Sequence, residues 1–186
     1  VGMGGAGFPT YVKLKPGKPI EAVLINACEC EPMLTADHRL MLENPEKVVR
    51  GAAMLGRILN ISNIIIGVET NKMDAVEALE EFTEQYGVKT AILRVRYPQG
   101  SEKQLINAIT GRTVKSGTLP MDAGCVVQNV ATCAALDDAV TLGIPLIERI
   151  VSVTGEVVAS PGNFRLKIGT PALEAVRFAG GVTAEP

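Results

Sequence analysis

Four short apolar segments recur along this 186-residue chain, and segments with helical spacing separate them. The apolar segments are residues 22–25, 63–68, 91–95 and 125–127. Continuous apolar runs of this length, without polar alternation, are typical of strands that are buried on both faces of a parallel sheet. The sequence therefore predicts an α/β fold, with a Rossmann-like, mainly parallel sheet and helices on both of its faces.

Capping residues predict where the intervening helices begin and end. A polar residue at the N-cap, a proline in the first turn and a glycine after the last turn are the usual signals. Because glycine and proline recur in the first nineteen residues, we expect that segment to be a loop. The predicted helices begin after Asn44, Asn71, Gly100 and Asn129, with Pro45 opening the first, Gly87 ending the second and Gly111 ending the third.

The pattern changes after about residue 146. Strand-like segments at 151–155 and 162–167 precede a short helix at 171–178 and the pair Gly180-Gly181. A strand, turn, strand and helix within about 40 residues predicts a small β-grasp domain. We therefore expect two domains, at residues 1–145 and 146–186.

Composition excludes several classes of partner. The net charge is −2, aromatic residues make up 4% of the chain and there is no Trp. These values argue against nucleic acid or an anionic membrane surface as the main partner. The most apolar stretch, residues 124–136, is too short to span a membrane and contains Gln128 and Asn129. We expect any membrane association to be indirect, through partner subunits.

Four cysteines are present, and we expect all of them to be free thiols in a reducing compartment. Cys28 and Cys30 are too closely spaced for an ordinary disulfide, and only His38 could assist them as a metal ligand, so no metal site is predicted. The chain begins inside a glycine motif without an initiator Met, which predicts that it is a fragment of a longer protein.

The glycine motif at residues 2–7 satisfies the pattern G-x-G-x-x-G. As a dinucleotide fingerprint this motif is weak, because Phe8 and Pro9 follow where a helix should begin. Its glycines would let the backbone approach a flat or phosphorylated ligand, and Lys13 could add a positive charge. A plain flexible turn and a lone surface lysine remain the alternatives.

Polar residues follow three of the predicted strands, where ligands bind in open α/β sheets. After the first strand come Asn26, whose amide both donates and accepts, and two carboxylates that could equally be solvated. The second group, residues 97–102, follows the third strand and leads into the N-terminus of a helix. The third group, residues 128–132, follows the fourth strand, and there Asn129 could simply be an N-cap.

Taken together, these segments resemble the flavin-binding motifs of the C subunit of Rnf-type electron-transport complexes and of its relative, the NADH-oxidising subunit of complex I. The matching stretches are GMGGAGFPTYVKL at residues 2–14, NACECEPMLTADHRL at 26–40, YPQGSEKQL at 97–105 and PMDAGCVVQNVAT at 120–132. Residues 151–181 resemble the SLBB β-grasp module that follows the flavin domain in that family.

The resemblance implies specific roles. It places Asn26 at the isoalloxazine edge of FMN, and Asn129 and Thr132 at its phosphate and ribityl chain. Cys28 departs from the complex I proteins, which usually have Asp there, and fits the Rnf branch, while Ser101 replaces one of two pocket carboxylates. The implied FMN-binding residues are Gly2, Gly4, Gly5, Lys13, Asn26, Cys28, Glu29, Gly100, Asn129 and Thr132; the implied NADH-binding residues are Phe8, Glu31 and Glu102.

The resemblance also implies a function. The protein would transfer electrons, by way of FMN, between NAD(H) and iron–sulfur clusters in parts of the subunit that lie outside this chain, with ferredoxin and other Rnf subunits as partners. It would lie peripherally on the cytoplasmic side of the bacterial inner membrane. No catalytic acid or nucleophile is expected. Glu69, near the end of the second strand, could favour a free ribose hydroxyl.

Three other functions stay open on sequence grounds. The cobalamin reductase of bacterial microcompartments shares the flavin domain, and neighbouring genes would distinguish it from the Rnf protein. A non-catalytic ligand-binding module would not need Gly4 or Lys13 for binding. A structural assembly subunit would have an empty flavin pocket, which the intact glycine motif argues against.

Overall fold

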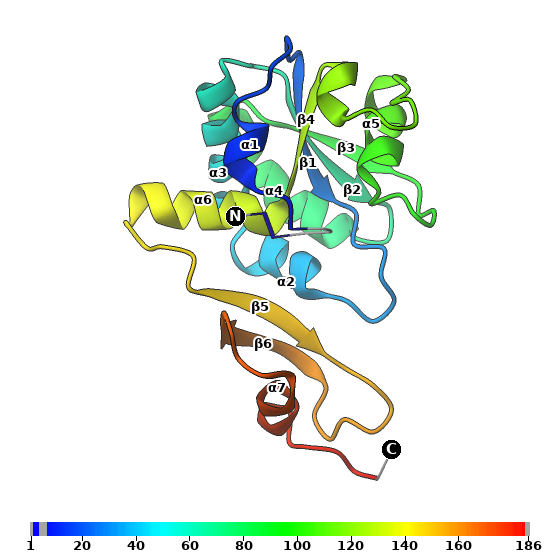
Figure 1. Cartoon of the computed structure of the whole chain (residues 1–186), viewed down its shortest axis with the longest axis vertical. Coiled ribbons are helices and arrows are strands. Elements are labelled where there is room, and N and C mark those ends of the chain that lie inside the picture. The colour runs from blue at the N-terminus through cyan, green and yellow to red at the C-terminus, as the bar shows by residue number, and fades with distance from the viewer. Residues whose placement is uncertain (1, 4–6, 185–186) are drawn as a thin grey trace.

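The computed structural model describes residues 2–3 and 7–184, and it shows a four-stranded sheet with helices followed by a smaller hairpin unit (Figure 1). The strands of the sheet are all parallel and lie in the order β3-β2-β1-β4. In chain order the elements are α1 (Thr10–Lys13), β1 (Ala22–Ala27), α2 (Ala36–Glu43), α3 (Pro45–Leu59), β2 (Ile64–Glu69), α4 (Met73–Tyr86), β3 (Lys89–Leu93), α5 (Glu102–Thr110), the 3₁₀ helix η1 (Pro120–Ala123), β4 (Cys125–Asn129), α6 (Val130–Thr141), β5 (Glu148–Val153), β6 (Gly162–Lys167) and α7 (Ala172–Phe178).

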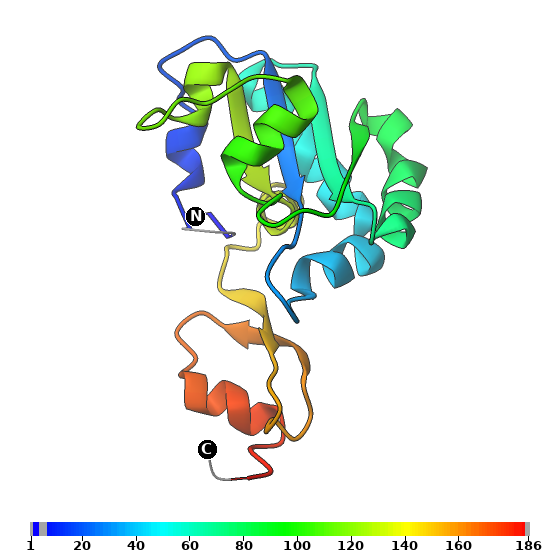
Figure 2. The same ribbon diagram turned by 90° about the vertical axis from the view of Figure 1, so that its right-hand side faces the viewer.

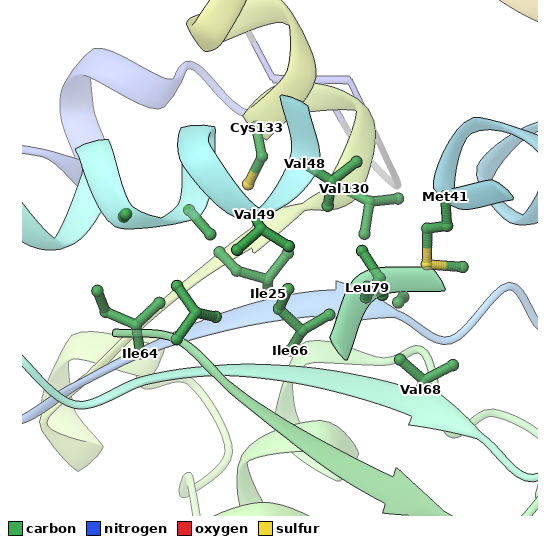
Figure 3. Packing of buried hydrophobic residues seen from close by; sticks show 14 of the residues in the cluster. Ile25, Met41, Val48, Val49, Ile64, Ile66, Val68, Leu79, Val130 and Cys133 are labelled. Atoms are coloured by element: carbon green, nitrogen blue, oxygen red, sulfur yellow. The ribbon is translucent and has the colours of Figure 1, made fainter. Parts of the chain in front are cut away.

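The sheet is buried on both faces, as its continuous apolar strands predict. Val23 and Ile25 of β1 point to one face, where they pack beneath α3, α4 and α6 (Figure 3). Leu24, between them, points to the other face and packs against Leu105 and Ile106 of α5. The predicted α/β class, with helices on both faces of a parallel sheet, is confirmed.

Two helices lie where no helix was predicted. α1 falls inside the expected N-terminal loop and begins directly after Pro9, which supplies its fixed backbone angle. α2 falls between the first strand and the helix expected at Pro45. Its first backbone N–H groups are capped by the side chain of Glu29, several residues upstream, rather than by an adjacent residue. A cap that comes from outside the helix leaves no local signal in the sequence.

Several predicted boundaries were wrong by a few residues. The third strand begins at Lys89 rather than at residue 91, because pairing with β2 extends an edge strand into polar residues. The helix expected after Asn71 begins at Met73, with Lys72 at its N-cap. β5 begins at Glu148, before the predicted position 151. The predicted helix ends at Gly87 and Gly111 are confirmed, and both glycines have positive φ.

β5, β6 and α7 form a second unit that lies against α2 (Figures 1 and 2). β5 and β6 are antiparallel, and Leu166, Ala175 and Ala179 supply buried apolar side chains in this unit. Thr35, at the N-cap of α2, accepts a hydrogen bond from Asn163 of β6 at 2.9 Å. The hairpin unit therefore touches the sheet domain through polar contacts at the carboxyl ends of the strands.

Within the described part of the chain, no helix is both long and apolar enough to cross a membrane.

Candidate functional site

A large cleft lies at the carboxyl ends of β1 and β4. Asn26, the second-last residue of β1, and Asn129, the last residue of β4, are direct register partners. After β1 the chain continues to β2 and β3 on one side of β1, whereas β4 pairs with the other side of β1. The strand order therefore reverses here, which makes this edge the topological switch point of the sheet. The cleft has a volume of about 1,210 Å³, and the β5 hairpin closes part of it. Pockets for one small ligand typically measure roughly 300–1,000 Å³, so this cleft has room for more than one ring system.

The structure brings the described candidate residues together around this cleft. They come from four separate stretches of sequence that converge through the parallel topology. Gly4 and Gly5 lie outside the described residues. The candidates that line the cleft are Gly2, Phe8, Lys13, Asn26, Cys28, Glu29, Glu31, Gly100, Glu102, Asn129 and Thr132.

Asn26 and Gly100 clamp two loops together at the cleft floor. The Asn26 amide donates to the carbonyl of Gly100 at 2.8 Å, and its oxygen accepts the Cys28 N–H at 3.1 Å. The Gly100 N–H in turn donates to the Cys30 sulfur at 2.8 Å. A Cβ at Gly100 would stand 2.3 Å from the Cys28 carbonyl oxygen. Only glycine therefore permits this approach of the two loops.

Lys13 forms an ion pair across the cleft. Its Nζ lies 2.6 Å from the Glu102 carboxylate and donates to the Val127 carbonyl at 2.9 Å. The same ammonium lies 5.9 Å from the centroid of the Phe8 ring, within cation–π range. Lys13 thus contacts both the nearby Phe8 and Glu102, which lies 89 residues away in the sequence, and the charges of Lys13 and Glu102 balance.

The N-termini of α2 and α6 meet at the cleft wall. Glu29 accepts the N–H groups of Asp37 at 2.9 Å and His38 at 3.3 Å. Asn129 caps α6 by accepting the Ala131 N–H, and its amide donates to Asp37 Oδ2 at 2.6 Å. Burial raises the pKa of Asp37 to about 6, and the Asn129 hydrogen bond opposes that shift by favouring the charged form.

Met3, within the glycine motif, contacts the first turn of α6. The Met3 N–H donates to Thr132 Oγ1 at 3.2 Å, and Thr132 is buried. A Cβ at Gly2 would stand 2.1 Å from the Phe8 carbonyl oxygen, so this glycine is needed for the segment to fold back on itself. Gly7 has a positive φ of 64°.

The cysteines at the cleft are structural thiols. All four cysteines are free, as predicted. The Cys28 sulfur donates to the Gly67 carbonyl at 3.5 Å, and burial raises the pKa of Cys28 to about 12. Its thiol is therefore protonated at neutral pH. Within the described residues, no cluster of three His, Cys, Asp or Glu side chains is arranged to hold a metal ion.

Three cleft residues were missed on sequence grounds. Asp37 lies within the NACECEPMLTADHRL stretch, but its approach to Asn129 depends on tertiary structure. Gln128 is buried, and its Nε2 has no hydrogen-bond partner among the described residues. Arg149 lines the cleft from β5 and no local motif marks it.

The expectation for Glu69 was wrong. Its carboxylate is buried beside Lys72, 3.7 Å away, and Glu69 does not line the cleft. Because the Glu69 carboxylate is enclosed next to the Lys72 ammonium, it is not presented to a ribose in the cleft.

Comparison with known proteins identifies the family of the sheet domain. Residues 1–138 match the Nuo51 FMN-binding domain, and residues 150–186 match the SLBB domain. The chain belongs to the Nuo51 FMN-binding family. The second match confirms the predicted SLBB unit of this Nuo51-family chain, while the division at residues 145 and 146 stays a prediction.

Curated relatives confirm the predicted resemblance to the Rnf family. The C subunit of the proton-translocating ferredoxin:NAD(+) oxidoreductase complex of Clostridium ljungdahlii is 49% identical over the whole chain. The C subunit of the Na(+)-translocating ferredoxin:NAD(+) oxidoreductase complex of Acetobacterium woodii is 45% identical. The chain spans 41% and 43% of these two relatives, about two fifths of their length.

A solved structure shares the architecture of the Nuo51-family chain. The crystal structure of an air-oxidised NAD+-reducing [NiFe]-hydrogenase is 26% identical, with a TM-score of 0.83. The match covers 97% of this chain and 36% of the hydrogenase chain. Both units of the fold are therefore included in the likeness.

The cleft fits a flavin mononucleotide on its own chemistry. Gln128 Nε2 is a buried donor without a protein partner among the described residues, and such groups are rare unless a ligand or water satisfies them. The N-terminus of α6 opens onto the same cleft and provides a site for a phosphate group. An aromatic ring and an ion pair flank the opening. The residues present therefore suit a polar-edged ring joined to a phosphate.

Proposed function

We propose that this chain binds FMN and NAD(H) in the cleft and serves as the NADH-binding part of the C subunit of an Rnf-type complex. The observation that carries the proposal is the convergence of the candidate motifs on one cleft at the switch point of the sheet. The family match to an FMN-binding domain and the ferredoxin:NAD(+) oxidoreductase names of the relatives support it.

FMN would lie with its phosphate at the N-terminus of α6. Thr132 and the backbone N–H groups of that first turn would hold the phosphate, since a helix N-terminus favours negative charge. Gln128 Nε2 would donate to a carbonyl or nitrogen of the ring system. Asn26, fixed by Gly100 and Cys28, would set the floor against which the ring lies.

NADH would enter from the opening of the cleft, between Met3 of the glycine motif and strand β5 of the hairpin unit. Phe8 is 46% exposed and would stack on a base or nicotinamide ring. Glu102 and Glu31 would accept hydrogen bonds from hydroxyl or amide groups, and Lys13 would exchange its Glu102 contact for a ligand anion. The bound flavin supplies the hydride-accepting chemistry, while these residues orient the nicotinamide and exclude water from its face.

The proposed partners follow from the relatives rather than from this chain alone. Electrons would leave toward iron–sulfur clusters, ferredoxin and the other subunits of the complex. The protein would be peripheral, on the cytoplasmic side of the bacterial inner membrane. Together these steps would make the whole protein an FMN-dependent oxidoreductase component that links NAD(H) with ferredoxin.

The test is flavin binding followed by reduction. Purified chain would be titrated with FMN while flavin fluorescence is monitored, and NADH would then be added without oxygen while the visible flavin absorbance is followed. We expect fluorescence quenching and then loss of absorbance. Quenching without loss of absorbance would instead support a ligand-binding module. No binding at micromolar FMN would contradict the proposal.

Lys13→Ala tests the proposed cleft in the same assay. Removing the ammonium should weaken FMN or NADH binding by roughly 10-fold, because charge-assisted hydrogen bonds contribute about 1.5–3 kcal/mol. Lys15→Ala is the matched control, since Lys15 is two residues away and does not line the cleft. Equal effects of the two variants would contradict a cleft-specific role for Lys13.

A further inference from the structure

Arg149 of β5 is one of the cleft residues that lie outside the flavin-binding family match. The FMN-binding match ends at residue 138, and the SLBB match begins at residue 150. Arg149 nevertheless lines the cleft, together with the neighbouring residues of β5. The hairpin unit thus contributes a cation to a site that the sheet domain otherwise forms.

The other cations on the cleft are already engaged. Lys13 pairs with Glu102, Lys47 with Asp138 at 2.7 Å, and Arg165 with Glu148 at 2.8 Å; Lys103 donates to the Lys115 carbonyl. Among the described residues, no carboxylate lies within ion-pair distance of Arg149. Its Nη2 donates a hydrogen bond to the Met3 carbonyl at 2.9 Å. The remaining guanidinium N–H groups are available to a ligand.

Met3 places Arg149 next to the proposed phosphate site. The Met3 carbonyl accepts from Arg149, while the Met3 N–H donates to Thr132 in the first turn of α6. A single residue therefore separates the guanidinium from the N-terminus of that helix. Guanidinium groups match phosphate oxygens in geometry and charge, and they bind them by paired hydrogen bonds.

We propose that Arg149 binds a phosphate group of a nucleotide in the cleft, so that the SLBB unit is part of the binding site. This inference rests on the proposed function, since it requires a phosphorylated ligand there. The phosphate could belong to FMN or to the pyrophosphate of NAD(H), because both carry the same chemistry. The carbonyl contact to Met3 would hold the side chain in place before the ligand arrives.

The experiment compares ligands with and without phosphate on Arg149→Ala. Dissociation constants would be measured for FMN, riboflavin and, on the FMN-loaded protein, ADP-ribose, which carries the pyrophosphate of NAD(H). We expect a loss of roughly 10- to 100-fold for the ligand whose phosphate Arg149 contacts, and less than 2-fold for riboflavin. A loss of affinity confined to FMN would identify the flavin phosphate as the group that Arg149 contacts. A loss of affinity confined to ADP-ribose would identify the pyrophosphate of the dinucleotide instead.

Two further variants separate binding from folding. Arg165→Ala is the matched control, because Arg165 also lines the cleft but is paired with Glu148. Arg149→Lys should lose less affinity than Arg149→Ala, since it keeps the charge without the planar fork. Unfolding curves of all variants should coincide, because the Arg149 side chain is exposed.

Two outcomes would overturn the assignment of Arg149. Equal losses of affinity for FMN and riboflavin would show that Arg149 only positions Met3 of the glycine motif and does not contact a phosphate. Unchanged affinities for every ligand in the variant, with binding intact in the wild type, would remove the role of Arg149 and leave the proposed function standing. A wild-type chain that binds none of the phosphorylated ligands would contradict both proposals.

Discussion

Gly100 lies where two backbone segments of the cleft approach each other closely. A methyl group there would meet the Cys28 carbonyl oxygen at 2.3 Å and the Cys30 sulfur at 3.1 Å. The loops would have to move apart, which breaks the hydrogen bonds from Asn26 and to Cys30. We predict that Gly100→Ala weakens FMN binding by at least 10-fold and lowers the free energy of unfolding by about 1–3 kcal/mol. Fluorescence titration and denaturant unfolding measure the two effects.

Gly162→Ala is the control for that variant. Gly162 has φ outside the left-handed region, and its added Cβ would meet only the Phe164 ring at 3.8 Å, an ordinary contact. Its FMN affinity should equal that of the wild type. Wild-type affinity in Gly100→Ala would show that the contact between the two loops is not needed for the flavin site.

Asp37 should make stability depend on pH in an unusual direction. Burial raises its pKa from 3.8 to about 6, so the folded state binds more protons than the unfolded state between these values. The stabilisation that comes from protonated Asp37 in the folded state is fully present below pH 3.8 and is lost as the pH rises through 6. We predict that Asp37→Asn removes this loss of stability with rising pH. Relative to the wild type, its free energy of unfolding should rise by about 1–3 kcal/mol between pH 4 and pH 7.

Urea unfolding of both proteins across that pH range measures the difference. An asparagine in place of Asp37 would keep an oxygen that accepts from the Asn129 amide, so the hydrogen bond itself is retained. Parallel pH profiles of the two proteins would contradict the assignment of the raised pKa to Asp37.

At the scale of elements, α3 and α6 cross with almost no space between their backbones. A Cβ at Gly51 of α3 would lie 2.0 Å from the carbonyl oxygen of Cys133 in α6. Alanine gains about 0.5–1 kcal/mol in helix propensity over glycine, but the helices would have to separate along a buried interface. Near this crossing, Arg50 and the buried Asp137 form a paired ion contact that also depends on the spacing.

We predict that Gly51→Ala is destabilised by about 1–3 kcal/mol, because overpacking outweighs the gain in helix propensity. For a chain of this size each kcal/mol lowers the midpoint of thermal unfolding by about 2–4 °C. Gly17→Ala is the control, since nothing lies within 4 Å of its added Cβ. An equal or raised midpoint for Gly51→Ala would mean that the two helices can separate at no cost.

The elements that the sequence predicts well are those whose signals are local. Continuous apolar runs mark β1, β2 and β4, and glycines with positive φ end α4 and α5. The α2 helix was missed because Glu29 caps it from a preceding loop. The start of β3 was missed because hydrogen bonding to β2, rather than side-chain hydrophobicity, determines where an edge strand begins.

The candidate site was predictable in part for the same reason. Residues at strand ends, such as Asn26 and Asn129, follow from the topological rule for open α/β sheets. Their mutual contacts do not, because the Lys13–Glu102 pair joins segments 89 residues apart. Arg149 had no signal at all, because it lies at the start of an ordinary strand and meets Met3 only when the hairpin docks.

At the scale of the whole molecule, a few polar contacts set the position of the hairpin unit. Asn163 donates to Thr35 at 2.9 Å and accepts from the Ser152 hydroxyl at 2.5 Å, while the Thr35 N–H donates to that same hydroxyl at 3.5 Å. Together with the hydrogen bond from Arg149 to the Met3 carbonyl, these bonds hold β5 along the cleft. Interfaces of this polar kind between units of one chain commonly permit relative motion.

We predict that Asn163→Ala loosens the docking of the hairpin while leaving its internal pairing intact. Hydrogen exchange of the Thr35 amide should speed up by roughly 5- to 10-fold, because each lost hydrogen bond contributes about 0.5–1.5 kcal/mol. Backbone amides that pair β5 with β6 should keep their exchange rates. Thr170→Ala is the control, since within the described ranges its hydroxyl bonds only to the nearby Lys167 carbonyl. Faster exchange throughout the hairpin would mean that Asn163 stabilises the hairpin itself rather than its docking against Thr35.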